Sequence, residues 1–74
     1  LKEAARAIAA GTPVAEALAG AEAAILAGGF ESIDYIALAD AFTLERLETW
    51  REPARLLAAA RLGRTRLIDN WPVG

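Results

Sequence analysis

The sequence contains no cysteine and no histidine. Without cysteine the chain cannot form a disulfide or a thiolate metal site. Without histidine it lacks the commonest metal ligand and the usual acid–base group near neutral pH. Zinc sites, Cys–His nucleophiles and Ser–His–Asp triads are therefore excluded within these residues, and we expect no metal site.

Basic charge and long apolar runs are also scarce. Eight Lys and Arg side chains stand against ten Asp and Glu, which gives a net charge of −2. Proteins that bind nucleic acid usually present a basic face, so nucleic acid is not an expected partner. No apolar run approaches the roughly 20 residues that a membrane-spanning helix needs, so we expect no membrane partner either.

With 74 residues, the chain has room for one small domain. Hydrophobic residues make up 55% of it, but many are alanine, so the core per residue is thin. The first residue is Leu1 rather than an initiator methionine, and it already stands inside a helical pattern. We interpret the chain as part of a longer protein.

Two helices are expected at the start of the chain. Ala, Glu, Lys and Arg dominate Leu1–Ala10, which is typical of the end of a helix. Gly11 suits a left-handed cap, Thr12 an N-cap and Pro13 the first position of a second helix that ends near Ala27. Its apolar seam consists of Val14, Leu18, Ala21 and Ile25. We expect the helices to pack as an antiparallel hairpin.

The segment Ser32–Asp40 alternates as a strand does. Ile36 and Leu38 point to one side, whereas Tyr35, Ala37 and Ala39 point to the other. Within this strand Asp34 and Asp40 are separated by about 20 Å, at about 3.3 Å per residue. That is too far for two carboxylates to share one reacting bond, so we interpret them as turn and cap residues.

The next two segments carry weaker patterns. Thr43–Trp50 predicts a helical turn or an irregular connection, with Trp50 as a hydrophobic plug or, alternatively, a ligand-stacking residue. Ala54–Leu62 favours a helix by residue propensity. Gly63 follows at once, however, so a strand in a hairpin is the competing interpretation.

The segment Gly63–Asn70 predicts a turn, a short strand and a stop. Asp69 and Asn70 favour turns, and Pro72 cannot donate to a strand ladder. We expect Arg66 and Asp69 to pair with nearby charges, and Asp40 or Asp69 to be the partner of Arg66. The alternative is that these charges act directly in chemistry, and Arg66 is the candidate for a phosphate contact.

Parts of the sequence resemble the C-terminal domain of the pantothenate synthetase family, whose members are also called pantoate–β-alanine ligases. These parts are Asp34–Asp40, the following Thr43–Leu44, and Ala58–Asn70, which contains the motif Arg-Leu-Ile-Asp-Asn. The resemblance covers nearly the whole chain. It implies an α+β fold, with an N-terminal helix hairpin packed on a small three-stranded antiparallel sheet. On this basis we predict a strand at Ala54–Leu62.

The resemblance also implies a function. Residues 1–74 would be the C-terminal lid domain of a cytoplasmic ligase of pantothenate biosynthesis, in the coenzyme A pathway, and a nucleotide-binding domain would precede it. Such an enzyme uses ATP and Mg to adenylate pantoate, and β-alanine then attacks the adenylate. The family's His-x-Gly-His and Ser-Ser-Arg-Asn elements are absent here, so no catalytic residue is carried over and the isolated chain is expected to be inactive.

Two surfaces remain as alternatives for the function of the chain. As a lid, the domain would turn the face with Tyr35, Ala37 and Ala39 toward the preceding domain. As a non-catalytic interaction module, its helix hairpin would present Val14, Leu18 and Ile25 to a partner. Exposed apolar surface on such a domain can also drive homodimer formation.

Overall fold

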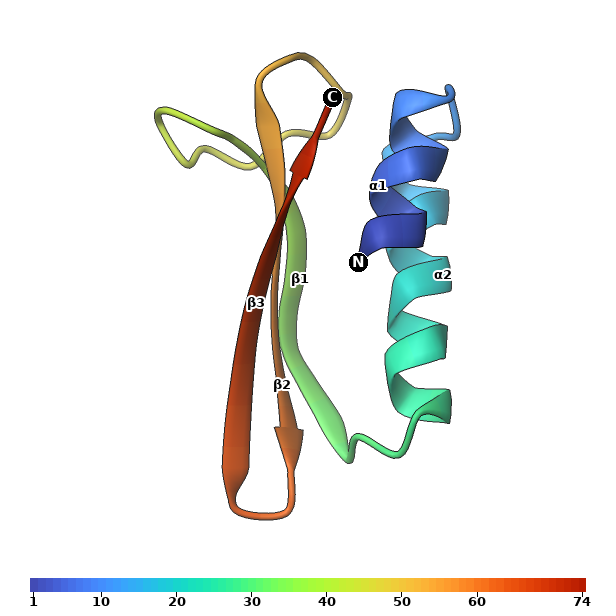
Figure 1. Cartoon of the computed structure of the whole chain (residues 1–74), viewed down its shortest axis with the longest axis vertical. Coiled ribbons are helices and arrows are strands. Elements are labelled where there is room, and N and C mark those ends of the chain that lie inside the picture. Colours follow the sequence, from blue (N-terminus) through green and yellow to red (C-terminus); the bar gives the residue numbers. More distant parts are fainter.

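Two helices precede three strands in the computed structural model, which describes all residues, 1–74 (Figure 1). The elements are α1 (Lys2–Ala9), α2 (Val14–Ala27), β1 (Ser32–Asp40), β2 (Ala54–Leu62) and β3 (Thr65–Val73). The strands form one antiparallel sheet in the order β1-β2-β3. The expected α+β fold, a helix hairpin on a three-stranded antiparallel sheet, is confirmed.

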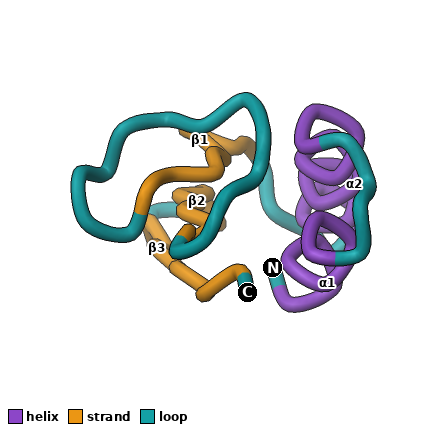
Figure 2. Tube along the Cα trace, turned by 90° about the horizontal axis from the view of Figure 1, so that it is seen from above, coloured by secondary structure: helices purple, strands orange, loops and turns teal.

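The helices lie side by side over one face of the sheet (Figure 2). Gly11, with φ at 107°, makes the left-handed turn that follows α1. The start of α2 differs from the prediction, because Pro13 is the N-cap residue and Val14 the first helical one. Pro13 has ψ at 137°, which is extended, so the helical backbone begins one residue later than expected and Thr12 provides no cap.

The core lies between the helix pair and the sheet. Its buried residues are Ala4, Ala5, Ile8, Val14, Ala17, Leu38, Ala54, Leu56 and Val73. Few of these side chains are large, as the alanine content predicts, and Ile8, Leu38 and Leu56 are the largest that are fully buried. Trp50 is half-buried and packs against this cluster, as the predicted hydrophobic plug does.

The segment Ala54–Leu62 forms β2, the central strand. The helix that residue propensity favours here is wrong, and the strand that the family resemblance implies is confirmed. Helix propensities differ by only tenths of a kcal/mol per residue, whereas β2 pairs with a strand on each side. The turn after β2 contains Gly63 at φ 60°, as the hairpin requires.

The last strand, β3, is longer than predicted. It continues through Asp69, Asn70 and Pro72 to Val73, so the predicted stop is wrong. Because β3 is an edge strand, the missing N–H of Pro72 is tolerated there. Val73 pairs with Ala54 and is buried, and this burial holds the strand end on the sheet.

The connection from β1 to β2 is irregular, which is one of the two predicted forms. Asp40 Oδ1 accepts hydrogen bonds from the backbone N–H of Phe42 (2.8 Å) and of Thr43 (3.0 Å). Asp40 is therefore a turn aspartate, as expected. Leu44 has φ at 62°, a region that non-glycine residues rarely occupy.

Candidate functional site on the uncovered sheet face

The face of the sheet that points away from the helices carries no helix (Figures 1 and 2). Successive strand residues point to opposite faces, and Leu38, Leu56 and Val73 point to the helices. Their neighbours therefore share the other face, which we call the open face. From the register it carries Tyr35, Ala37, Ala39, Arg55, Leu57, Ala59, Arg61, Arg66, Ile68, Asn70 and Pro72.

Tyr35, Ala37 and Ala39 share the open face, as the alternation predicts. Ala37 and Ala39 are nonetheless buried, at 7% and 1% exposure. The large hydrophobic side chain exposed on this face is that of Ile68, at 65% exposure. It lies in register with Ala59 and, beyond it, with Tyr35. A ligand or partner on this face would therefore contact the larger side chains around the alanines.

A charged cluster crosses the open face near the β2–β3 turn. Arg61 Nε lies 3.1 Å from Asp34 Oδ1, and Arg66 Nε lies 2.7 Å from Asp34 Oδ2. Arg61 and Arg66 are direct partners in the register of β2 and β3. The register of β1 shifts between Ile33 and Tyr35, so Asp34 stands at a bulge. One carboxylate thus holds two guanidinium groups from two different strands.

The electrostatics of this cluster keep Asp34 ionised. The hydrogen bond from Arg66, and then the one from Arg61, hold the pKa of the Asp34 carboxyl below its usual value. Both arginines reach Asp34 through Nε, and their terminal amino groups make no hydrogen bond within the chain. Each guanidinium group is therefore held through its Nε, and its terminal amino groups remain available as hydrogen-bond donors.

The partner predicted for Arg66 is wrong. Its carboxylate is Asp34, not Asp40 or Asp69. Asp69 takes part in none of the ion pairs, and its Oδ1 accepts the N–H of Asn70 instead. Alternation places Asp69 on the helix side of β3, and Asp40 lies at the other end of β1. Neither can reach Arg66, whose phosphate contact stays a prediction.

Residues that the sequence reasoning did not single out complete the open face. Arg61 joins the Asp34 cluster, and Arg55 Nε donates to Asn70 Oδ1 at 3.0 Å. The position of the turn at Gly63 could have predicted the role of Arg61. If the two flanking strands pair outward from that turn, Arg61 lies directly opposite Arg66, as the structure shows.

The β1–β2 connection projects on the side of the sheet away from the helices (Figure 1). Among its exposed residues are two large apolar ones, Phe42 at 84% exposure and Leu44 at 61%. Asp40 anchors the turn and also pairs with Arg51 at 3.2 Å. The backbone N–H groups of Thr43 and Phe42 are the main cause that holds the pKa of Asp40 below its usual value.

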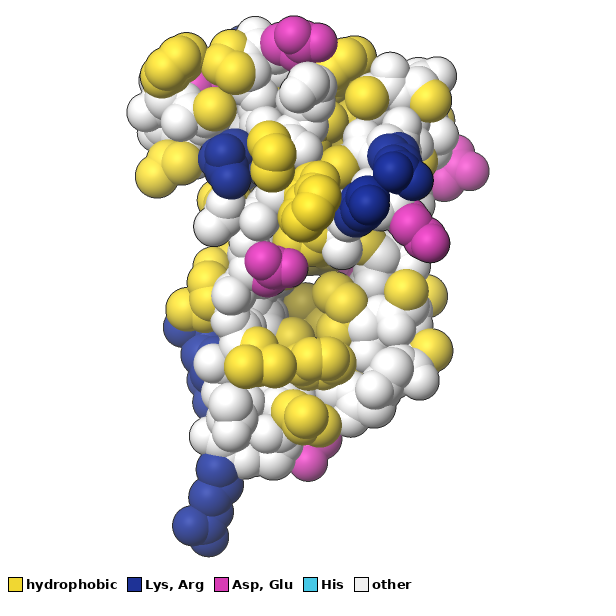
Figure 3. Space-filling view, in the orientation of Figure 1, with side chains coloured by type: hydrophobic (Ala, Val, Ile, Leu, Met, Phe, Trp, Pro, Cys, Tyr) yellow, Lys and Arg dark blue, Asp and Glu magenta, His cyan; other side chains and the backbone are white.

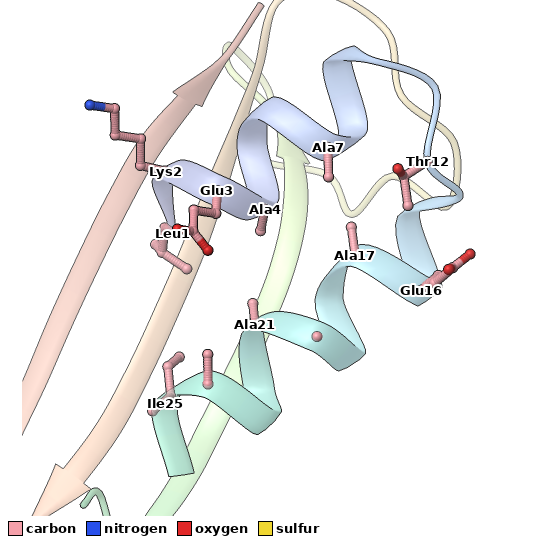
Figure 4. A pocket seen from close by; sticks show the side chains of 12 residues that line it. Leu1, Lys2, Glu3, Ala4, Ala7, Thr12, Glu16, Ala17, Ala21 and Ile25 are labelled. Atoms are coloured by element: carbon pink, nitrogen blue, oxygen red, sulfur yellow. The ribbon is translucent and has the colours of Figure 1, made fainter. Parts of the chain in front are cut away.

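A groove of about 670 Å³ runs between α1 and α2. Figure 4 shows small side chains such as Ala17 and Ala21 pointing into it, with Ile25 at one end and Leu1 opposite. The helix surface proposed for a partner is largely occupied already. Val14 is buried and Leu18 packs against the core, so Ile25 alone of that set lines the groove. This weakens the interaction-module alternative.

Other kinds of site have little support in the arrangement of side chains. No group of three or more Asp or Glu side chains comes together that could hold a metal ion. Neither helix has both the length and the apolar character needed to cross a membrane.

Comparisons with known proteins give one consistent result. A family model described as pantoate-beta-alanine ligase matches residues 1–72. Pantothenate synthetase of Sphingopyxis alaskensis is 73% identical over 74 residues, which are 100% of this chain and 26% of that protein. Pantothenate synthetase of Rhizorhabdus wittichii is 58% identical over 73 residues, 99% of this chain and again 26% of the relative.

The fold has a solved counterpart. The crystal structure of pantothenate synthetase from Thermus thermophilus superposes with a TM-score of 0.81 at 38% identity. It covers 95% of this chain, which in turn spans 25% of that protein. The chain thus corresponds to about a quarter of the length of the proteins it resembles.

Proposed function

The chain belongs to the pantoate–β-alanine ligase family, and on this premise we propose that it is the C-terminal lid domain of an ATP-dependent, AMP-forming ligase. The full-length enzyme condenses pantoate with β-alanine to make pantothenate, in the cytoplasm and as a step toward coenzyme A. A preceding nucleotide-binding domain holds ATP, magnesium and the reacting groups. The family match over nearly all of these residues supports this proposal.

The chemistry proposed for the full-length enzyme has two steps. The pantoate carboxylate attacks the α-phosphorus of ATP and diphosphate leaves, which gives a pantoyl adenylate. The amine of β-alanine then attacks the acyl carbon, and AMP leaves. An acyl adenylate is hydrolysed by water, so a domain that closes over it protects the intermediate.

The observation that carries the lid assignment is the open face itself. One side of the three-stranded sheet carries no helix, and Ile68, Phe42 and Leu44 are exposed on or beside it. Exposed apolar side chains of this kind are typical of a surface that docks on another domain. The helices cover the opposite face only in part, because they bury Leu38, Leu56 and Val73 but leave Leu62, Leu67 and Trp71 exposed. We assign the contact with the preceding domain to the open face, which carries no helix.

The lid assignment is tested in the full-length enzyme with Ile68→Arg. This residue is exposed on the open face, so the substitution challenges docking rather than the core. Leu26→Arg on α2 is the matched control, because Leu26 is also exposed, at 44%, but lies on the helix layer. The measurement is the ratio of AMP released to pantothenate formed.

We expect Ile68→Arg to raise that ratio, because adenylate leaks to water, while Leu26→Arg leaves it at the wild-type value. Equal ratios in the two variants would contradict the assignment of the face. We also expect the isolated 74-residue chain to release no diphosphate from ATP in the presence of pantoate and β-alanine.

A further inference from the structure

We propose that Arg61 and Arg66, held by Asp34, form a binding site for a phosphoanhydride group, either free diphosphate or the triphosphate tail of ATP. The inference rests on the proposed ligase function and names a ligand for the open face. Three observations support it: Asp34 holds both guanidinium groups in place, the cluster has one positive charge without a partner, and the terminal amino groups of both arginines are free to donate.

The geometry comes from the strand register. Arg61 and Arg66 are direct cross-strand partners, so their Cβ atoms lie about 5 Å apart on one face. Asp34 engages both through Nε, at 3.1 Å and 2.7 Å. Fixing Nε limits the rotation of each guanidinium group, so an incoming ligand meets donors that are already in place.

The charge of the cluster favours an anion. Like charges directly opposite each other destabilise a sheet, and Asp34 compensates only one of the two arginines. The cluster therefore keeps one net positive charge within a chain of net charge −2. Figure 3 shows Lys and Arg side chains along the lower left edge of the molecule, where β3 and the β2–β3 turn lie, and others in its upper half.

The free donors match the chemistry of phosphate oxygens. The terminal amino groups of both arginines have no partner within the chain. Planar guanidinium forks bind pairs of phosphate oxygens, and two neighbouring forks suit two linked phosphoryl groups. The proposed reaction supplies such a group twice, first as the tail of ATP and then as the diphosphate that leaves.

The test uses the full-length enzyme and inorganic diphosphate as the probe. Binding is measured by calorimetry on wild type, on Arg61→Gln, and on Arg64→Gln as the control. Arg64 lies in the same hairpin turn and forms no ion pair, so its variant removes a nearby charge and leaves the ion pairs of Asp34 with Arg61 and Arg66 in place. Arg66 keeps its bond to Asp34 in the Arg61 variant, and thermal unfolding checks the fold of each protein.

We expect Arg61→Gln to weaken diphosphate binding about tenfold or more, as the loss of a charged hydrogen bond does, and Arg64→Gln to weaken it less than about twofold. A rise in the KM for ATP in Arg61→Gln assigns the site to the ATP tail, and an unchanged KM assigns it to the released diphosphate. Wild-type affinity in Arg61→Gln, or no diphosphate binding by wild type, overturns the site. A different result would overturn the ligase function alone: the wild-type enzyme makes no pantothenate but binds diphosphate, and the Arg61→Gln variant does not bind it.

Discussion

Arg66 on β3 reaches across the central strand to Asp34 on β1, with its Nε 2.7 Å from the carboxylate. Neighbouring strands lie about 4.8 Å apart, so this ion pair spans two strand spacings. The bulge at Asp34 and the length of the arginine side chain make the contact possible. The two edge strands of the sheet are therefore tied directly to each other as well as through β2.

This arrangement predicts a coupling between Asp34 and Arg61. Asp34→Ala should lower the urea midpoint of the protein, because Arg61 and Arg66 then face each other without a carboxylate. Adding Arg61→Ala to that variant removes the repulsion. The double variant should therefore lose less than the sum of the two single losses. Additive losses would show that the cluster is not coupled.

The turn at Asp40 predicts a pH dependence. Since the folded-state pKa of Asp40 is lowered from its usual 3.8, its contribution to stability is present above that value and lost as the pH falls through the folded pKa. Asp40→Asn keeps an acceptor for the turn but has no charge. Wild type should have the higher urea midpoint near neutral pH, and the gap should close in acid. A gap that stays constant down to about pH 2 would contradict this account.

Two residues with a left-handed backbone, one in the β1–β2 connection and one in the β2–β3 turn, predict substitutions of opposite sign. Leu44 has φ at 62° and an exposed side chain, so Leu44→Gly should relieve strain and stabilise the protein by about 1 kcal/mol. Gly63 has φ at 60° in the β2–β3 turn, so Gly63→Ala should cost about 1 kcal/mol. Thermal unfolding measures both, and shifts of the same sign would refute the strain argument.

The thin core predicts that one leucine is decisive. Leu56 is fully buried in the central strand, so Leu56→Ala should cost about 2–5 kcal/mol. That is much of the stability of a small domain, which is about 5 kcal/mol at the low end. Leu62→Ala, at an exposed position of the same strand, should cost less than about 1 kcal/mol. Urea unfolding that gives similar losses for both would place the core elsewhere.

Local sequence patterns predicted the elements that carry their own signals. Alternation located β1 at Ser32–Asp40, and Gly11–Pro13 marked the break between the helices. Composition misplaced β2, because Ala, Leu and Arg prefer helices only slightly and pairing on both sides outweighs that preference. The resemblance to a family was needed there. The end of β3 was missed because edge strands tolerate Pro72.

The charged cluster could be predicted only in part. Arg66 was singled out from its position in a short strand, but its partner Asp34 is 32 residues away along the chain. That contact depends on the register of three strands and on a bulge, and no local pattern encodes either feature. Arg61 would have followed from the hairpin once β2 was known to be a strand.

Hydroxyl-radical footprinting of the full-length enzyme tests directly whether the open face closes over the reaction, as we propose. The enzyme is oxidised alone and then with ATP and pantoate, which form the adenylate in the proposed reaction. We predict that oxidation of Ile68 and Phe42 falls when the adenylate forms, while that of Leu26 on the helix layer stays the same. Protection of Leu26 with Ile68 and Phe42 unchanged would contradict the account.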